Sequence, residues 1–397
     1  MTSAETNVAA AVGARDYLDF VFDASGWKRL GESDWHVCAG GAIGGRDMLA
    51  VTLGNADSPI PPQALNDLAR VVGREGNSSL LFVLTPDEIS NEPDQYLAVN
   101  HLLAELSLRR KRSPIIAVVL GPLVGPMAML ARLADIICFG PEGSLALADA
   151  VTAKRIPSRN EASPQPGELS CAFATDAAAL LGLRRITNLL PTGPRSGSNE
   201  NASDGGEDLA FERLAGSDTS QHVDERRLLQ RIADDRSFVE FKSSGGLTGY
   251  LARIGGEPVG VLASTAAMSG ALDAAALAQA GKLVGFCGRH DMRVITLVDC
   301  PGVVPDDAAL GGLANLVTAW TDSGVAVISL VVRKAIGAAA AALMPSSAAD
   351  HVVMHWPDAR VGLLKDAAGA PQGRLISGRE TRRALVEALA SFREAPV

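Results

Sequence analysis

The chain has 397 residues, of which 47% are hydrophobic and 20% charged. This composition excludes fibrous and wholly disordered proteins and predicts two or three globular domains. The formal net charge of −9 argues against a broad surface for nucleic acid or anionic membranes. The five cysteines are odd in number and widely spaced, so we expect no zinc ribbon and no C-x-x-C redox pair. Cysteine usage of this kind favours a reducing, cytoplasmic location.

Two segments bear on membrane association and secretion. Residues 1–14 have no basic region before an apolar stretch, so no secretory signal is expected. Residues 114–131 contain no charged side chain and reach the lower length limit of a membrane span. Three prolines interrupt this segment, at positions 114, 122 and 126, and its first six apolar residues favour a buried parallel strand. We therefore expect no membrane-spanning helix here.

The same succession of patterns occurs twice along the chain. A short helical pattern that ends at an aromatic residue spans 17–27 and returns at 228–238, 211 positions later. A glycine turn entering an apolar strand follows at 44–51 and returns at 255–261, at the same offset. Three later matches, offset by 212 to 215 positions, pair the strands before Pro86 and Pro301, those before Gly125 and Gly337, and residues 133–138 with 348–353.

The conserved order and offset of these matches indicate an internal duplication, although α/β chains in general share such patterns. Each repeat alternates strands and helices, which predicts two tandem α/β domains. Residues 195–219 lie between the repeats and are rich in Ser, Gly, Asn, Asp and Glu without an apolar period. We expect an N-terminal domain over 1–194, a flexible linker over 195–222 and a C-terminal domain over 223–397.

In each repeat a buried strand runs into a glycine that is followed by a helical stretch of small or apolar residues. The glycine is Gly125 in the first repeat and Gly337 in the second. Small residues let a ligand approach the backbone, and the start of a helix presents N–H groups without intrahelical acceptors. Two such groups aimed at one oxygen form an oxyanion hole. Tight packing of helix on strand explains the same residues equally well.

The second repeat resembles the C-terminal domain of the carboxyltransferase (β) subunits of biotin-dependent acyl-CoA carboxylases, of the propionyl-CoA and acetyl-CoA carboxylase type. The resembling positions are 255–260, 270–273, 282, 286–287, 298–302, 333–337, 349–350 and 356–357. The first repeat resembles the family's N-terminal domain more weakly, at 17–27, 120–122, 125 and 134–135. The resemblance implies two tandem crotonase-like domains, each a ββα superhelix, related by duplication.

The resemblance also implies a reaction. The N-terminal domain would hold acyl-CoA and the C-terminal domain carboxybiotin, with the two sites meeting across the interface of a homodimer or a ring of dimers. CO2 would pass to the α-carbon of the thioester through an enolate held by backbone oxyanion holes. Biotin would arrive on a biotin carboxyl carrier protein, loaded by a biotin carboxylase, and this chain would hold no metal.

The residues that carry this implied chemistry are few. The oxyanion holes would involve Gly125 in the first domain and Ala338 and Ala339 in the second. Gly337 and Ala341 would contact substrate, Ala341 at a position that lines the acyl pocket in the family.

The first domain departs from the family pattern. The family's Gly-Gly pair reads Gly125-Pro126 here, and proline has no N–H to donate. Residues 85–89 have neither the glycines nor the arginine of the family's loop. These departures leave open a non-catalytic partner subunit of an active carboxyltransferase. A decarboxylase of a malonyl-type thioester, with or without biotin, also stays open because the same oxyanion holes serve both directions.

Other candidate groups have simpler interpretations. The basic run 109–112 could bind CoA phosphates, but capping of a helix C-terminus is the favoured reading. Asp299 could be a general base, but a strand-end residue in a turn is favoured. His351 and His355 lie on an expected strand, where their spacing does not suit a shared metal ion.

Overall fold

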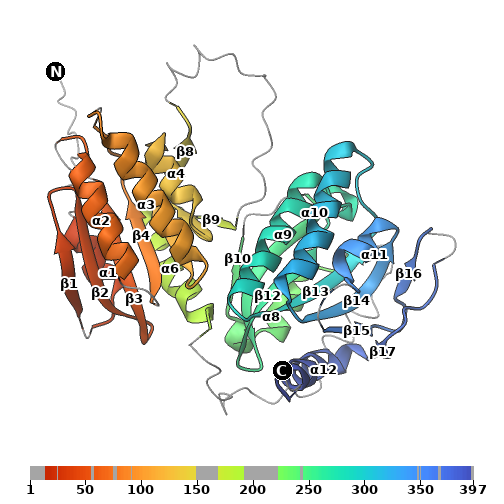
Figure 1. Ribbon diagram of the computed structural model, residues 1–397. Coiled ribbons are helices and arrows are strands. Elements are labelled where there is room, and N and C mark those ends of the chain that lie inside the picture. The colour runs from red at the N-terminus through yellow and green to blue at the C-terminus, as the bar shows by residue number, and fades with distance from the viewer. Residues whose placement is uncertain are drawn as a thin grey trace, which may run out of the picture. The chain divides into compact units, whose positions relative to one another are not determined.

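The computed structural model describes residues 14–24, 26–54, 58–74, 78–90, 92–148, 169–191, 222–241, 245–346, 348, 350–364 and 368–394 (Figure 1). Their contacts form two compact units, unit 1 within 1–158 and 172–184 and unit 2 within 159–171 and 185–397. The expected linker lies outside the described residues except for His222, as does Ala349. The exact domain boundaries therefore stay predictions.

Unit 1 is built on one sheet with the strand order β1-β2-β3-β4-β5-β7-β9. The pairs β1–β2 and β2–β3 are antiparallel, whereas β3, β4, β5 and β7 run parallel to one another. Its strands are β1 (Trp27–Glu32), β2 (His36–Ile43), β3 (Arg46–Leu53), β4 (Ser79–Leu84), β5 (Ile115–Val119), β7 (Ile136–Phe139) and β9 (Ser170–Ala172), with β6 (Pro122–Val124) paired to β8 (Ser144–Ala146). Its helices are α1 (Ala14–Val21), α2 (Pro62–Arg74), α3 (Gln95–Arg110), α4 (Pro126–Arg132) and α6 (Asp176–Leu189). The boundaries after residues 171 and 184 fall within β9 and α6, which are counted with unit 1 because β9 follows β7 in this sheet.

Unit 2 repeats this topology with the strand order β10-β11-β12-β13-β14-β15-β17, and β16 pairs with the end of β14. Its strands are β10 (Phe238–Glu240), β11 (Leu247–Ile254), β12 (Glu257–Ser264), β13 (Arg293–Cys300), β14 (Val327–Ile336), β15 (His351–His355), β16 (Arg360–Gly362) and β17 (Arg374–Leu375). Its helices are α8 (Glu225–Ile232), α9 (Ala274–Arg289), α10 (Asp307–Ser323), α11 (Ala338–Leu343) and α12 (Thr381–Glu394), with short 3-10 turns at Asp234–Arg236, Ala267–Gly270 and Gly378–Glu380.

The duplication predicted from the sequence is confirmed by this correspondence. The helices α1 and α8 begin 211 positions apart, and so do the strand pairs β2/β11 and β3/β12. The strands β5 and β14, and the helices α4 and α11, begin 212 positions apart. The long strand β14 takes the place of both β5 and β6, because its last residues pair with β16 as β6 pairs with β8.

In each unit an aspartate bonds to the glycine turn between two strands and pairs with an arginine. The carboxylate of Asp234 accepts hydrogen bonds from the N–H groups of Gly255 and Gly256, at 2.9 and 2.7 Å, and pairs with Arg382 at 2.6 Å. Unit 1 has the same arrangement, made by Asp23, Gly44, Gly45 and Arg184. The hydrogen bond from Gly45, with that from Gly44 and the arginine, lowers the pKa of Asp23. Neither of these aspartate–arginine pairs was expected from the sequence, because their partners are far apart along the chain.

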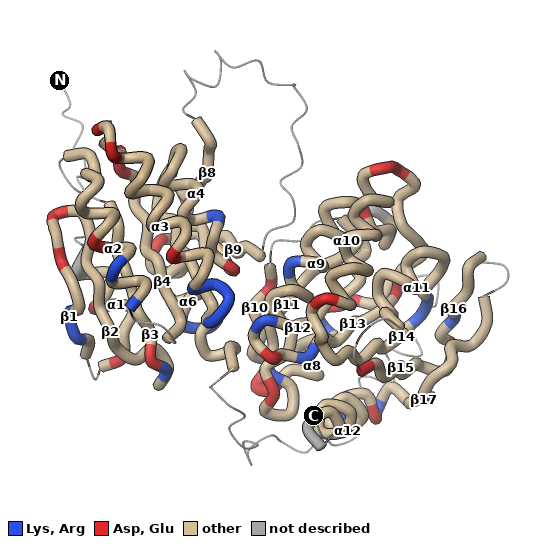
Figure 2. The backbone as a smooth tube through the Cα atoms, in the orientation of Figure 1, with Lys and Arg blue, Asp and Glu red and all other residues tan. Residues whose placement is uncertain are grey.

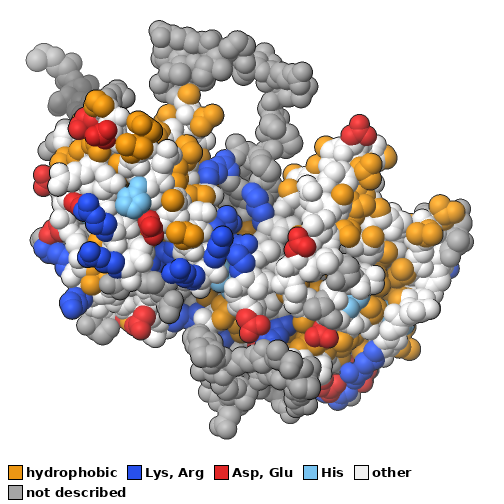
Figure 3. All heavy atoms as spheres, viewed as in Figure 1, with side chains coloured by type: hydrophobic (Ala, Val, Ile, Leu, Met, Phe, Trp, Pro, Cys, Tyr) orange, Lys and Arg blue, Asp and Glu red, His pale blue; other side chains and the backbone are white. Residues whose placement is uncertain are grey.

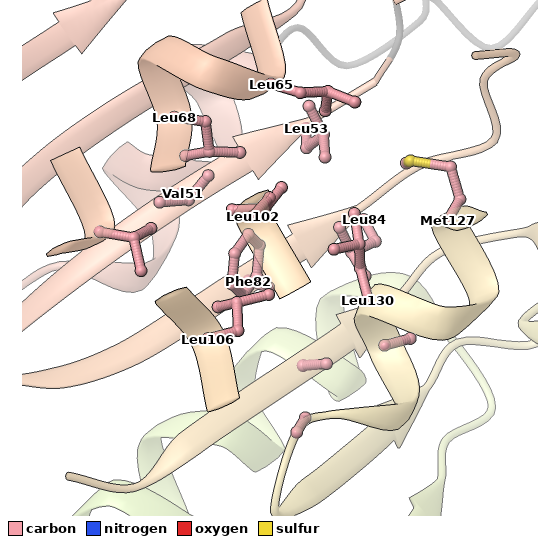
Figure 4. Packing of buried hydrophobic residues seen from close by; sticks show 14 of the residues in the cluster. Val51, Leu53, Leu65, Leu68, Phe82, Leu84, Leu102, Leu106, Met127 and Leu130 are labelled. Atoms are coloured by element: carbon pink, nitrogen blue, oxygen red, sulfur yellow. The ribbon is translucent and has the colours of Figure 1, made fainter. Parts of the chain in front are cut away.

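The core of unit 1 packs α2, α3 and α4 against one face of the sheet. Figure 4 shows the side chains involved, which include Val51, Leu53, Leu65, Leu68, Phe82, Leu84, Leu102, Leu106, Met127 and Leu130. Met127 and Leu130 belong to α4 and are almost fully buried. Each such side chain stabilises its helix by about 1.5–3 kcal/mol through apolar burial, so α4 is held in place by large apolar groups.

The charge-free segment 114–131 forms β5, β6 and the first turns of α4, as its prolines indicate. In β5 every residue is buried, as a parallel strand covered on both faces requires. In the part of the chain that the structure describes, no helix has both the length and the apolar character needed to cross a bilayer.

All five cysteines are buried free thiols. Burial raises the pKa of Cys38, Cys171 and Cys287 to about 12 and that of Cys300 to about 11. Since the thiolate is the reactive form, these side chains behave as small apolar core groups.

We expect iodoacetamide at about pH 8 to leave the folded protein unmodified. At this pH, which is well below the raised pKa of the buried thiols, very few of them are ionised. After unfolding in guanidinium chloride all five should react. Intact-mass spectrometry of the two samples measures the difference, and rapid labelling of a thiol in the native sample would show that the core around it is open.

Candidate functional site

The central feature of each unit is a glycine turn between the sheet and a short helix. Gly337 joins β14 to α11 with φ 61° and ψ −135°, and Gly125 joins β6 to α4 with φ 58° and ψ −126°. Positive φ strongly favours glycine at both positions. The N–H of Gly337 donates to the carbonyl of Gly362 at 2.8 Å, and that of Gly125 to Ala146 at 2.9 Å. The two turns therefore share one backbone geometry, each fixed by a neighbouring strand.

Unit 2 presents two successive backbone donors after its turn. Helical geometry gives the N–H groups of Ala338 and Ala339 no acceptor within α11, whereas Ala340 donates back to Gly337 at 3.2 Å. Ala338 is exposed and Ala339 is buried. The turn thus has two successive amide donors of the kind that stabilises a developing oxyanion, of which that of Ala338 belongs to an exposed residue and that of Ala339 to a residue with no exposed surface.

Unit 1 presents fewer donors at the matching place. Its helix begins with Pro126, which has no N–H, so Met127 is the first residue of α4 with a backbone donor. The N–H of Gly125 is already bonded to Ala146, so Gly125 shapes the turn rather than donating to a ligand. The N–H of Gly337 is bonded in the same way, so the missing N–H of Pro126 is what makes unit 2 the stronger of the two candidate sites.

Exposed leucines lie next to both the Gly337 turn and the Gly125 turn. Leu363 and Leu364 follow β16 and are 85% and 69% exposed, and Leu147 follows β8 and is 82% exposed. The carbonyl oxygens of Leu363 and Leu147 lie 3.6 and 3.7 Å from where a Cβ on the adjacent turn glycine would be. Hydrophobic side chains are also exposed over α10 (Figure 3), where Leu310 is 66% exposed. An apolar edge beside amide donors suits a ligand with a polar oxygen on a hydrocarbon body.

Ala341 is exposed on α11, one turn after Ala338. Its methyl group leaves the surface of this short helix without a bulky side chain. The assignment of Ala341 to an acyl pocket stays a prediction.

Asp299 lies within β13 rather than in a turn, and its side chain is 2% exposed. Its carboxylate oxygens lie 3.6 Å from Nζ of Lys334 and 3.3 Å from Nδ1 of His222, and one accepts from the N–H of Val223. Lys334 is three residues before Gly337 in β14. Oδ2 of the carboxylate thus accepts a hydrogen bond, whereas Oδ1 has Lys334 at ion-pair distance and no hydrogen-bond donor among the described residues.

The basic run 109–112 lies at the end of α3, where Figure 2 shows the backbone in blue. Arg109 is 3% exposed, and its guanidinium donates to the carbonyls of Val72 and Ser78 at 2.7 and 2.6 Å. Arg110 pairs with the buried carboxylate of Asp135 at 2.7 Å. The carbonyls bonded by Arg109 belong to α2 and to the residue before β4, so neither arginine caps α3 itself and the interpretation as a solvated cap is wrong for Arg109. Both guanidinium groups are engaged within the protein rather than presented to a phosphate.

No group of three His, Cys, Asp or Glu side chains suited to a metal ion occurs among the described residues. The two histidines of β15 bond separately, His351 through Nε2 to the hydroxyl of Ser329 at 3.0 Å and His355 through Nδ1 to the carbonyl of Trp356 at 3.1 Å.

Comparison with known proteins gives the family. The model of the carboxyl transferase domain matches residues 104–372. The putative propionyl-CoA carboxylase beta chain of Bacillus subtilis (strain 168) is 25% identical over 271 residues, which are 63% of this chain and 53% of that protein. The methylmalonyl-CoA carboxyltransferase 12S subunit of Propionibacterium freudenreichii subsp. shermanii is 25% identical over 272 residues, 63% and 52% of the two chains.

A further relative is the methylmalonyl-CoA decarboxylase subunit alpha of Propionigenium modestum, 24% identical over 276 residues that make up 64% of this chain and 53% of that protein. The chain thus spans about half the length of the curated relatives it matches.

Among solved structures, a transcarboxylase 12S hexamer with methylmalonyl-CoA and methylmalonic acid bound superposes with a TM-score of 0.86 at 19% identity, covering 97% of this chain and 90% of that chain. A single-chain, multi-domain long-chain acyl-CoA carboxylase gives 0.70 at 18% identity, covering 95% and 42%. These likenesses confirm the predicted fold of two tandem crotonase-like domains. Because the family model covers more than half of its residues, the chain belongs to the carboxyl transferase domain family.

Proposed function

We propose that this chain is the carboxyltransferase subunit of a biotin-dependent acyl-CoA carboxylase and transfers CO2 from carboxybiotin to the α-carbon of an acyl-CoA thioester. The observation that carries the proposal is the pair of successive amide donors, Ala338 and Ala339, presented by the Gly337 turn. Family membership supplies the reaction class. The chemistry asks the protein for oxyanion stabilisation rather than for a nucleophile, which fits a turn built of backbone donors.

Carboxybiotin, delivered on a partner protein, would release CO2, the biotin anion left behind would accept the α-proton of the thioester, and the resulting enolate would attack the CO2. The amides of Ala338 and Ala339 would donate to its ureido oxygen as negative charge develops there. In unit 1 the N–H of Met127, beside the Gly125 turn, would donate to the thioester oxygen. With no donor at the position that matches Ala338, unit 1 would bind acyl-CoA and stabilise its enolate less strongly.

We also assign partners from this proposal. A biotin carboxylase and a biotin carboxyl carrier protein would act with this chain, and the chain would assemble as dimers or rings of dimers. The 12S relative is described as a hexameric assembly. Exposed leucines on α10 and after β16 supply apolar surface of the kind that subunit contacts use.

A decarboxylase is the second candidate, and the similarity to the methylmalonyl-CoA decarboxylase alpha subunit favours it specifically. The same amide donors would stabilise the enolate formed when a malonyl-type thioester loses CO2. A non-catalytic partner subunit is the third candidate, and Pro126 is the residue that favours it.

One assay on the purified full-length chain separates the three candidates. The chain is supplied with methylmalonyl-CoA or malonyl-CoA, with and without free biotin, and decarboxylated CoA product is followed by chromatography. We expect product only when biotin is present, because biotin must accept the carboxyl group. Product without biotin would support the decarboxylase, and no CoA binding by folded protein in calorimetry would support the partner subunit.

Introducing into unit 2 the proline that unit 1 has after its turn glycine tests the amide donors. Ala338→Pro removes one N–H at the first helical position, where proline is tolerated, and the Gly125-Pro126 turn shows that this backbone accepts it. We expect kcat to fall about 10²- to 10³-fold, the usual loss for one oxyanion-hole donor.

Two variants serve as controls. Ala338→Gly keeps the N–H and should stay near the wild-type rate, and Pro126→Ala adds a donor to unit 1 and should raise the affinity for acyl-CoA. Circular dichroism checks that each variant folds. An Ala338→Pro enzyme with full activity would remove the Ala338 amide from the mechanism.

A further inference from the structure

The helix α11 carries both proposed donors but has little packing of its own. It has six residues, five of them alanine, and buries the side chains of Ala339, Ala342 and Leu343. A helix this short does not form alone in water, and an alanine methyl group buries little apolar area. The matching helix α4 is anchored by Met127 and Leu130 instead.

A buried polar network holds the C-terminal end of α11. The carbonyl oxygen of Leu343 lies 2.6 Å from the hydroxyl of Thr296 in β13 and 3.0 Å from that of Ser329 in β14, and the two hydroxyls lie 3.0 Å apart. The indole N–H of Trp320 in α10 donates to the carbonyl of Ala342 at 3.0 Å. Thr296, Ser329 and Trp320 are fully buried. The last carbonyls of a helix have no intrahelical donor, and here side chains supply it.

The network continues into a third strand. Nε2 of His351 in β15 lies 3.0 Å from the hydroxyl oxygen of Ser329. Burial lowers the pKa of His351, so the ring is neutral at neutral pH and carries one N–H. Residues of β13 and β14 therefore bond the end of α11 directly, and a residue of the adjacent parallel strand β15 bonds to one of them.

Unit 1 has apolar residues at the corresponding positions. Ala117 precedes Ser329 by 212 positions, the same offset that separates Gly125 from Gly337. It pairs with Phe82 across β4 and β5, as Ser329 pairs with Thr296 across β13 and β14. The polar anchor is thus peculiar to the unit that has two amide donors after its turn.

We propose that Thr296, Ser329 and Trp320 are positioning residues that fix α11 and thereby aim the amides of Ala338 and Ala339. The chemical part of this inference rests on the proposed function, whereas the anchoring of α11 does not. An oxyanion-hole donor must lie within about 2.7–3.1 Å of the charged oxygen, so a small displacement of the helix weakens it. The loss falls on the transition state, where the charge develops, and therefore on kcat rather than KM.

The test is Thr296→Val in the full-length chain, which removes the hydroxyl at nearly constant volume. The matched control is Thr52→Val, since Thr52 is a buried threonine of β3 whose hydroxyl has no hydrogen-bond partner among the residues that the structure describes. We expect Thr296→Val to lower kcat about 5- to 10-fold at unchanged KM, the value of one net hydrogen bond. Backbone amides in 338–344 should exchange hydrogen faster, whereas those in 127–132 should not. The variant Thr296→Ser keeps a hydroxyl and should show the wild-type kcat and exchange rates.

Each outcome decides one part of the inference. Unchanged exchange in 338–344 would overturn the anchoring, and faster exchange with an unchanged kcat would overturn the link to the amide donors. Faster exchange in a chain that shows no transfer activity even as wild type would support the anchoring and reject the proposed function. Thr52→Val should change neither quantity, and a change there equal to that in Thr296→Val would overturn the assignment. Ser329→Ala serves as a second variant if Thr296→Val does not fold.

Discussion

The candidate site depends on one backbone constraint, a glycine at positive φ that turns the chain from a strand directly into a short helix. In both units the N–H of that glycine is bonded to a neighbouring strand, which fixes where the helix begins. The first amides of the helix then point away from any intrahelical acceptor. Sheet, turn and helix start thus hold the backbone amides in place, and the proposed chemistry requires no reactive side chain.

Duplication has kept the architecture and altered the two sites. Strand order, the aspartate that clamps the glycine hairpin and the turn glycine recur in both units. The differences gather around the short helices. Unit 1 combines Pro126 with an apolar anchor, and unit 2 combines two amide donors with a polar anchor at Thr296 and Ser329. A helix made of alanines needs directional bonds to hold its position, because its side chains bury too little area.

Sequence patterns reveal features that are local or repeated. The duplication, the buried strand after Pro114 and the turn glycines follow from periodicity, proline and glycine placement. Contacts between distant residues are not visible in this way. The Asp234–Arg382 pair joins residues 148 positions apart. In the sequence, Thr296 and Ser329 are single polar residues within apolar strands, and only the folded structure shows that both contact the carbonyl of Leu343. The sequence also cannot show that the N–H of Gly125 already has an acceptor in β8.

The central claim is that the turn after β14 receives the oxygen of a ligand through the amides of α11. Its most direct test is amide hydrogen exchange of the full-length chain with saturating biotin and without it. The account predicts slower exchange confined to the first residues of α11, with no change at the start of α4. Protection elsewhere in unit 2, with α11 unaffected, would contradict it and would place the biotin site away from the Gly337 turn.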